Sequence, residues 1–483
     1  MPILTARTSS RPPAHLCFDV SPYRGAPDLS VLDGAGQDRG LDVVSIADLL
    51  RNGCVYPPHT IYRDVSVAGV SFAPATASEA GRAPPALCCD FPALWPARPS
   101  ATGANEDAAV DRYHALLCES AARTTRSMGA PWLLQSGGKD STSLAIALAE
   151  VRPDTTCLTY RGGHEEDEVA SARQVARRLG LRHEALVCDP SRAYQRYLAM
   201  VPRMPLLTAD FAMLSYADIA WEVSNRGGDG MIDGLGSDSY FGMPAHGTKR
   251  IAMALAQGWR LPPALFDLPG IRNSFAACYA LAAIQMDRFE RAFPGSRFTD
   301  AEVDALLGRP LSTRSRQRRD AYAPSIGKRP PPQTWHEISI TLIEQACLAK
   351  GLYVSAAEGL QLAFPYCDEA MRRWVACELA PPLRLGKDGT NKVIVRRHIA
   401  RHFGELPYVS AKGSFRFDLR GLARQRFDQV HAFACESADL MPGAQAWLES
   451  HRKRLDNKYF ASKFYLLAVI LPWLAHHGSD TAA

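Results

Sequence analysis

Apolar and polar positions follow two different rhythms along this chain of 483 residues. Between about 108 and 238, short apolar runs alternate with stretches whose apolar residues recur at helical spacing. The apolar runs predict strands at 131–135, 155–162, 183–188 and 230–238. The helical spacing predicts helices at 108–123, 142–151, 166–180 and 212–227. Because parallel strands need a crossover between them, the alternation predicts a twisted parallel sheet with flanking helices.

The two ends of the chain show other patterns. Residues 1–95 predict short β segments and turns, with strand character at 64–74. Alanine, proline and serine dominate 75–107, which predicts a linker, and from about 250 onward the pattern is mainly helical. We therefore predict a small β-rich unit over 1–107 and an α/β unit with a largely helical C-terminal part over 108–483.

Composition narrows the class of protein. Apolar residues make up 47% and charged residues 22%, which is typical of a globular protein, and a net charge of +5 indicates neither nucleic acid nor a membrane surface. The cysteines show no C-x-x-C pair and no Cys/His spacing typical of zinc, so we expect reduced thiols in a cytoplasmic protein. The longest apolar run, 464–475, is interrupted by Pro472 and is too short to span a bilayer, so it predicts a buried helix.

A run of small and hydroxyl residues, SGGKDS, starts at Ser136 between a predicted strand and a predicted helix. Gly137 and Gly138 let the backbone approach an anion closely, and the first N–H groups of the helix favour negative charge there. Ser136 and Ser141 add hydroxyl groups. Asp140 would repel phosphates unless Mg2+ lay between them. The segment predicts a phosphate site that also binds Mg2+, and the plain alternative is a strand-to-helix turn with a serine cap.

The SGGKDS segment resembles the pyrophosphate-binding loop of the PP-loop ATP pyrophosphatases, which split ATP between its α and β phosphates. MIDGLGSDSYFG at 231–242 is similar to the S-G-E-G-S-D-E-x-F-G-G motif of asparagine synthetases. The segments at 364–385 and 391–415 resemble the P-F-L-D and K-x-x-x-R…R-x-K-x-G-F segments of the same family. These ordered matches predict an asparagine-synthetase-like domain with the α/β fold of PP-loop ATP pyrophosphatases.

The resemblance implies a role for individual positions. Asp140 and Asp238 match two ligands of Mg2+ that stand at separate strand ends, where open α/β sheets bind ligands. Lys412 matches a catalytic lysine that neutralises charge on the α-phosphate and on the developing acyl oxyanion. The positions that match ATP or pyrophosphate contacts are Leu134, Ser136, Gly137, Gly138, Asp140, Ser141, Gly236, Lys392 and Arg396.

The N-terminal part departs from the family pattern. Asparagine synthetases usually begin with a glutaminase domain whose nucleophile is a cysteine at position two, and Pro2 stands there in this chain. The N-terminal part is also short, although 45–70 resembles the end of that domain. We expect a reduced remnant without glutaminase activity, so glutamine-derived ammonia is not the expected nucleophile.

The acyl site departs as well. Leu235 stands where asparagine synthetases have a glutamate that lines the pocket for the acyl group, and where β-lactam synthetases have a tyrosine. The resemblance therefore implies that this wall of the acyl pocket is apolar and lacks a general base. Ser239 replaces the glutamate that follows the metal-binding aspartate. The amine either arrives neutral or loses its proton to another group, and the candidates near in sequence are Asp233, Asp210 and His246.

The group with these departures includes β-lactam synthetases, lasso-peptide cyclases and amide-forming enzymes of specialised metabolism, such as antibiotic biosynthesis. The resemblance implies an AMP-forming carbon–nitrogen ligase that uses ATP and Mg2+ to adenylate a carboxylate and passes the acyl group to an amine. The substrates would be small molecules or peptides, with no membrane or nucleic acid involved. An intramolecular cyclase, a homodimer and a complex with biosynthetic partner proteins all stay open.

Two alternatives belong to other classes of protein. An RNA-modifying PP-loop enzyme would use the basic, proline-rich segment 308–333, which has no periodicity and predicts a mobile surface loop. A non-catalytic partner that binds nucleotide would explain Leu235 and Ser239. Against it, the SGGKDS segment, Asp238 and Lys412 are all present.

Overall fold

A five-stranded parallel sheet, in the order β7–β6–β5–β8–β9, organises the α/β part of the chain. The strands are β5 (Pro131–Leu134), β6 (Thr156–Arg161), β7 (Arg182–Val187), β8 (Gly230–Ile232) and β9 (Gln361–Ala363). The sequence predicted the first four, but β9 has only three residues and no periodic signal. From β5 the order runs outward in both directions, so the crevice beyond β5 and β8 is a topological switch point, where open sheets bind ligands.

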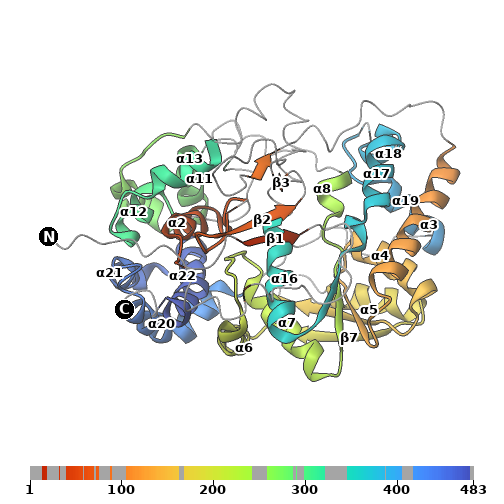
Figure 1. Cartoon of the computed structure of the whole chain (residues 1–483), viewed down its shortest axis with the longest axis horizontal. Helices are drawn as coiled ribbons and strands as arrows, with labels where there is room; N and C mark the ends of the chain where they lie inside the picture. The colour runs from red at the N-terminus through yellow and green to blue at the C-terminus, as the bar shows by residue number, and fades with distance from the viewer. Residues whose placement is uncertain are drawn as a thin grey trace.

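The structure is a computed structural model, shown in Figure 1. It describes residues 14–18, 32, 40–57, 59–69, 72–74, 87–89, 105–162, 168–241, 258–286, 290, 298–320, 345–386, 388–404 and 417–478.

Helices alternate with the strands of this sheet. The sequence predicted four of them, at 108–123, 142–151, 166–180 and 212–227, but it did not predict Pro190–Met200 or Ser237–Phe241. The helices are α3 (Glu106–Thr124), α4 (Lys139–Val151), α5 (Glu168–Arg178), α6 (Pro190–Met200) with η4 (Val201–Arg203), α7 (Met213–Asn225) and α8 (Ser237–Phe241). The predicted strand 230–238 is therefore wrong beyond Ile232, because a turn follows and α8 begins at Ser237. In open α/β sheets a strand commonly ends at the ligand crevice and a helix follows it. The apolar pattern did not show where the strand ends and the helix begins.

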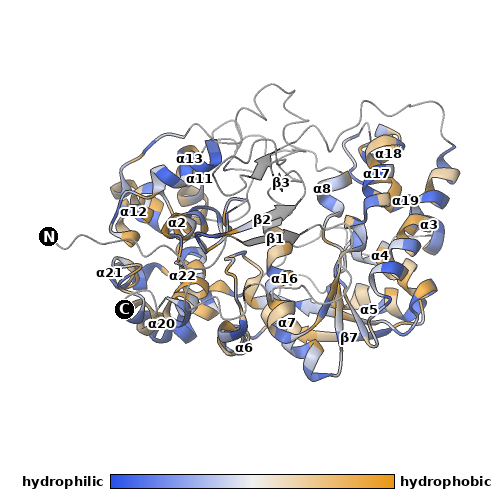
Figure 2. Ribbon diagram, in the orientation of Figure 1, coloured by the Kyte–Doolittle hydropathy of each residue, from blue (hydrophilic) through white to orange (hydrophobic). Residues whose placement is uncertain are grey.

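The rest of the described chain is mainly helical, as expected. Its helices up to residue 384 are η5 (Pro263–Asp267), α10 (Pro269–Arg272), α11 (Phe275–Gln285), α12 (Asp300–Leu307), α13 (Ser312–Asp320), α16 (Gln345–Glu358), η8 (Pro365–Cys367), α17 (Glu369–Cys377) and α18 (Pro381–Arg384). The later helices are α19 (Val393–Phe403), α20 (Leu419–Glu436), α21 (Ala444–His451), η9 (Arg452–Arg454) and α22 (Lys458–His477). Figure 1 shows α3, α4, α17 and α19 gathered at one end of the molecule and α12, α20, α21 and α22 at the other. Figure 2 shows both apolar and polar positions on helices such as α2, α12 and α20, the pattern of helices with one buried face.

The N-terminal part holds a second, smaller sheet, in the order β1–β2–β3–β4. Its strands are β1 (Ala14–Phe18), β2 (Val65–Gly69), β3 (Phe72–Pro74) and β4 (Leu87–Cys89), and the helix α2 (Val43–Asn52) lies between the first two in sequence. The strand character predicted at 64–74 is confirmed as β2 and β3. The boundary at residue 107 stays a prediction, although α3 begins next to it.

The helix α22 contains the longest apolar run and continues through Pro472. The predicted interruption is therefore wrong, because the packed surroundings offset the hydrogen bond that a proline removes. Among the described residues this one helix is long and apolar enough to cross a membrane, and 83% of its apolar window is buried inside the protein. The expectation of a buried helix is met.

The basic segment after residue 308 is ordered where the structure describes it. The predicted mobile loop is wrong for α13, whose arginines pair with carboxylates from other elements: Arg316 Nε donates to Asp300 Oδ2 at 2.6 Å, and Arg318 Nη1 donates to Asp48 Oδ2 at 2.9 Å. Local sequence showed only the positive charge, since the partners lie far away in the chain. Residues 321–333 lie outside the described part.

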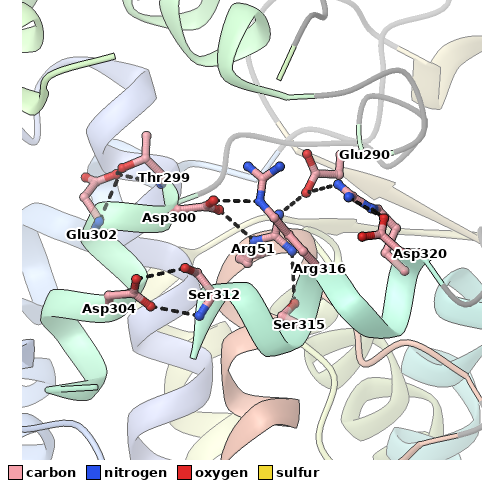
Figure 3. Close-up of polar contacts among 11 residues, drawn as sticks. Arg51, Glu290, Thr299, Asp300, Glu302, Asp304, Ser312, Ser315, Arg316 and Asp320 are labelled. Carbon is pink, nitrogen blue, oxygen red and sulfur yellow. Dashed lines mark hydrogen bonds and ion pairs between the residues drawn. The ribbon is translucent and has the colours of Figure 1, made fainter. Parts of the chain in front are cut away.

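Arg51 of α2 is the buried centre of this network, as Figure 3 shows. Its guanidinium donates to Asp300 Oδ1 at 3.1 Å and to Ser315 Oγ at 3.0 Å, and it pairs with Glu290. A buried arginine shared by two carboxylates and a hydroxyl orients the elements that carry them. The network thus attaches the N-terminal helix α2 to α12 and α13.

Asp48, at the edge of this network, should make the protein less stable as the pH rises from about 4 to 7. Burial raises the pKa of Asp48 to about 6 from 3.8, although Arg318 lowers it. Between these values the folded chain holds a proton that the unfolded chain has lost, so the free energy of unfolding falls with pH. In the unaltered protein the free energy of unfolding should fall by roughly 3 kcal/mol between pH 4 and pH 7, and Asp48→Asn should abolish this fall. Urea unfolding across this pH range would measure both. An unchanged pH profile would show that Asp48 does not titrate in this window.

Candidate functional site

The SGGKDS loop leads from β5 into α4 at the carboxyl edge of the sheet. The Ser136 amide donates to Ser141 Oγ at 3.1 Å, and the Gly138 amide donates to Ser136 Oγ at 3.2 Å. Gly138 is the N-cap of α4 and, having no side chain, leaves room for a ligand atom at the start of the helix. The two serine hydroxyls hold the loop in the folded shape that a cradle for an anion requires.

A carboxylate from another element already contacts this loop. The Gly137 amide donates to Glu168 Oε2 at 3.0 Å, and Glu168 is the first residue of α5. A carboxylate oxygen on a loop N–H stands in for a phosphate oxygen, because both are charged oxygen acceptors. Glu168 is not predicted from the sequence, since no local pattern relates it to the loop.

Lys392 joins the two aspartates that the sequence assigned to Mg2+. Its Nζ donates to Asp140 Oδ1 at 2.8 Å and to Ser237 Oγ at 2.9 Å, and it forms an ion pair with Asp238 Oδ1. The side chain is fully buried, which lowers its pKa, but Asp140 and Asp238 outweigh that effect and raise the pKa above its usual value. The lysine is therefore charged, and it brings two carboxylates from separate strand ends to one cation.

The backbone of Lys392 is itself strained. With φ of 53°, it is the one non-glycine residue at positive φ within the described ranges, and it serves as the N-cap of α19. Such a conformation costs about 1–3 kcal/mol for a residue other than glycine. A glycine would adopt this backbone conformation without strain. Lysine at this position therefore contributes its ammonium group at the expense of backbone strain.

Gly236 shapes the turn that presents Asp238. Its φ of 94° lies where a side chain is strained, and α8 begins at the next residue with Ser237 and then Asp238. The turn directs Ser237 to Lys392, while Asp238 stays exposed. The sequence analysis grouped Gly236 with the nucleotide-binding residues, and the structure gives it a backbone role beside them.

The remaining predicted residues are distributed as follows. Leu134 ends β5 and is half-buried against the core. Arg396 lies one turn beyond Lys392 and donates to the Asn391 carbonyl at 3.1 Å. Lys412 lies outside the described residues, as does His246.

The two described candidates for a general base are held in buried contacts. Asp233 accepts a hydrogen bond from the Tyr216 hydroxyl, and its Oδ1 accepts one from the Leu235 amide at 3.0 Å. Asp210 Oδ1 lies 3.3 Å from Lys350 Nζ. Both carboxylates are buried and engaged in contacts inside the protein, which favours a structural role. Leu235 itself is half-buried and packs against the core.

A chain of hydroxyl groups supports the first turn of α4, and the sequence analysis did not find it. The Tyr366 hydroxyl donates to the Asp140 carbonyl at 2.9 Å and lies 3.1 Å from the Tyr113 hydroxyl. Tyr113 in turn lies 2.8 Å from Ser143 Oγ. Tyrosines at apolar positions read as core residues in a sequence, and only the fold shows where their hydroxyls meet.

Asp368, in the segment that resembles P-F-L-D, caps α17. Its Oδ1 accepts from the amides of Ala370 at 3.0 Å and Met371 at 3.4 Å, and it forms an ion pair with Arg123. A capping carboxylate that is also paired holds the start of the helix in place.

A parallel sheet whose switch point carries a glycine- and serine-rich loop at the start of a helix, beside a cluster of charged side chains, is the arrangement of an α/β protein that binds a ligand at its strand ends. The sequence profile described as asparagine synthase matches residues 112–416, well over half of the chain. The chain belongs to the asparagine synthase family, which confirms the resemblance seen in the motifs. Membership implies the use of ATP and supports an ATP-dependent amide-forming ligase.

Two solved structures are similar to this chain. The NMN synthetase from Francisella tularensis is 14% identical, with 52% of this chain and 97% of that chain covered at a TM-score of 0.22. The NH3-dependent NAD synthetase from Campylobacter jejuni, in complex with the nitrate ion, is 13% identical, with 50% and 96% covered at a TM-score of 0.23. A comparison with curated proteins gives no match.

The carboxylate of Glu168 should compete with the phosphates of ATP for the loop. Glu168→Gln should tighten the binding of ATP by about tenfold, because a neutral amide oxygen accepts the Gly137 hydrogen bond less strongly and does not repel phosphate. Calorimetric titration with a non-hydrolysable ATP analogue would measure the change. Glu184→Gln, which alters a glutamate paired with Arg226, is the matched control. Weaker binding by Glu168→Gln would instead show that Glu168 assists the ligand.

Proposed function

We propose that this protein adenylates a carboxylate with ATP, releases pyrophosphate, and transfers the acyl group to an amine. The convergence of Asp140, Asp238 and Lys392 beside the SGGKDS loop carries the proposal. Loop amides and the start of α4 suit phosphate oxygens, and the carboxylates suit a cation. This combination is what cleavage between the α and β phosphates needs.

The donor set of the two aspartates fits Mg2+. Asp140 and Asp238 already share one cation in the structure, the ammonium of Lys392. Mg2+ prefers a small number of protein carboxylates together with phosphate oxygens and water. These two residues would hold the ion, which when bound would supply positive charge to the phosphates.

The groups of the chain would then act on ATP as follows. A carboxylate oxygen of the substrate attacks the α-phosphorus, and the bond to the β-phosphate breaks with its electron pair leaving on pyrophosphate. The loop amides and the charged Lys392 stabilise the negative charge on the leaving group. Lys412, as a further part of the proposal, neutralises the α-phosphate.

The second half-reaction would join the acyl group to an amine. The amine nitrogen attacks the acyl carbon, the bond between that carbon and the phosphate oxygen breaks with its electron pair leaving on AMP, and the extra proton of the nitrogen passes to solvent. Since Leu235 is not a base and Asp233 and Asp210 are engaged, we propose that the amine binds in its neutral form, with His246 as the alternative base. The apolar Leu235 also favours an acyl donor less polar than aspartate, in specialised metabolite or peptide biosynthesis. An intramolecular cyclase would use the same chemistry.

Exchange of labelled pyrophosphate into ATP tests the proposal. Pools of amino acids, small carboxylates and peptides would be screened with Mg2+, and exchange should depend on one carboxylate. Adding the matching amine should then produce AMP. Formation of ADP and phosphate instead would contradict an adenylating ligase.

Binding measurements beside this assay separate the alternatives. Tight ATP binding without AMP from any mixture would favour a non-catalytic nucleotide-binding partner, as Leu235 and Ser239 first indicated. Salt-sensitive binding of tRNA would favour an RNA-modifying enzyme. That alternative has lost support, because Arg316 and Arg318 are paired with carboxylates inside the protein.

A further inference from the structure

Three side chains able to bind a metal meet outside the nucleotide site. His114 and Cys118 lie one turn apart on α3, and Glu150 lies in the last turn of α4. Their ligand atoms all lie within 4.8 Å of one another, and no other group of three or more such side chains in the described ranges does so. His114 Nε2 is 3.0 Å from Glu150 Oε2 and 3.6 Å from Cys118 Sγ.

These separations are close to those of a tetrahedral zinc site. With the bond lengths usual for zinc, neighbouring nitrogen and oxygen ligands lie about 3.3 Å apart, and nitrogen and sulfur about 3.5 Å. A nitrogen, a sulfur and a carboxylate oxygen suit zinc, whereas Mg2+ and calcium avoid thiolates. Glu150 is exposed and can move outward by the small distance that an ion requires, and Cys118 is buried.

The second ring nitrogen of His114 has a suitable partner. His114 Nδ1 is 2.9 Å from His398 Nε2, and His398 Nδ1 is 2.9 Å from Ser143 Oγ. A histidine that binds a metal usually donates its other N–H to an acceptor, which fixes the ring and its tautomer. When His114 Nδ1–H donates to His398, the lone pair of His114 Nε2 is free to face Glu150 and Cys118.

We propose that His114, Cys118 and Glu150 form a zinc-type transition-metal site that braces α3 against α4. On binding, the ion displaces the thiol proton of Cys118 to solvent, and the fourth position takes a water molecule. Asp140 lies about 15 Å along α4 from Glu150, from the rise of a helix. The ion therefore does not touch the phosphates but steadies the helix that begins at their loop.

The helix α20 offers an internal comparison. His431 and Cys435 repeat the spacing of His114 and Cys118, and His431 Nε2 lies 3.1 Å from Glu449 Oε1. The Cys435 thiol, however, donates to the His431 carbonyl at 3.4 Å, so its sulfur is directed at the helix backbone. The second set therefore has the same residue types without the arrangement of ligand atoms.

Titration with Co2+ of the full chain, freed of metal with a chelator, tests the site. Excess Mg2+ would be present to keep Co2+ from the carboxylates of the nucleotide site. We expect one Co2+ per chain with a thiolate-to-cobalt charge-transfer band, displaced by Zn2+. Cys118→Ser should abolish the band, Glu150→Gln should weaken binding by about tenfold or more, and Cys435→Ser should change neither.

Three results would overturn the site: no thiolate band in the unaltered protein, a band that survives Cys118→Ser, or a band lost in Cys435→Ser. If Cys118→Ser does not fold, Glu150→Gln decides, because Glu150 is exposed and its replacement leaves the packing unchanged. Unaltered Co2+ affinity in Glu150→Gln would then contradict the proposal. None of these readouts depends on ligase activity, so the site can fail or stand independently of the proposed function.

Discussion

Replacement of Lys392 by methionine should lower the free energy of unfolding by about 3–5 kcal/mol in the absence of Mg2+. The ammonium is fully buried and is shared by Asp140, Ser237 and Asp238. Without it, Asp140 is left as a buried carboxylate beside a second one, and neither burial nor repulsion is offset. Urea unfolding followed by circular dichroism would measure the loss.

Mg2+ should restore part of this stability, because the two carboxylates freed by Lys392→Met would bind the ion. Lys463→Met is the matched control, since Lys463 is also buried and lies 2.7 Å from both carboxylate oxygens of Glu302, far from the nucleotide site. It should destabilise the protein to a similar degree with no response to Mg2+. An equal response in both variants, or none in Lys392→Met, would show that the aspartates do not form a site for this ion.

Replacement of Asp238 by asparagine should reduce pyrophosphate exchange by a factor of about 10²–10³, the usual effect of removing one group that stabilises charge in a transition state. Stability should change by less than about 1 kcal/mol, because Asp238 is exposed and Lys392 keeps its bonds to Asp140 and Ser237. The exchange assay and a thermal unfolding curve on the same preparation would separate the two effects.

Asp428→Asn is the control for this second change, as Asp428 is an exposed aspartate of α20 that pairs with Arg452 at 3.1 Å. It should leave both exchange and stability unaltered. Full exchange activity in Asp238→Asn would remove Asp238 from the site, whereas a large loss of stability would mean that it is mainly structural.

Local pattern in the sequence was enough to predict most of the α/β part. The strands β5 to β7, the start of β8 and the helices α3, α4, α5 and α7 follow apolar spacing, whereas α6 was not predicted. The SGGKDS loop follows from glycines and hydroxyls placed between a strand and a helix. Secondary structure that depends on the spacing of apolar residues within one short segment can be predicted from that segment alone. The strand β9 was missed, because three residues paired to β8 gain their structure from the neighbouring strand.

Pairings between distant residues could not be predicted in the same way. The arginines of α13 appeared to belong to a mobile basic loop, since their partners Asp300 and Asp48 come from other helices. Likewise, no local signal places Glu168 on the Gly137 amide. Each of these contacts depends on how whole elements pack.

The sequence by itself determined the class of this protein: a parallel α/β sheet, a glycine- and serine-rich loop between a strand and a helix, and membership of the asparagine synthase family. Tertiary structure alone decided that Lys392 holds Asp140 and Asp238 together. It also decided that the sulfur of Cys118 lies beside His114 and Glu150, whereas the sulfur of Cys435 is directed at the backbone of its own helix. The physical reason is the same in both cases: spacing along a helix sets which face a side chain occupies, but packing between elements sets which atoms it meets.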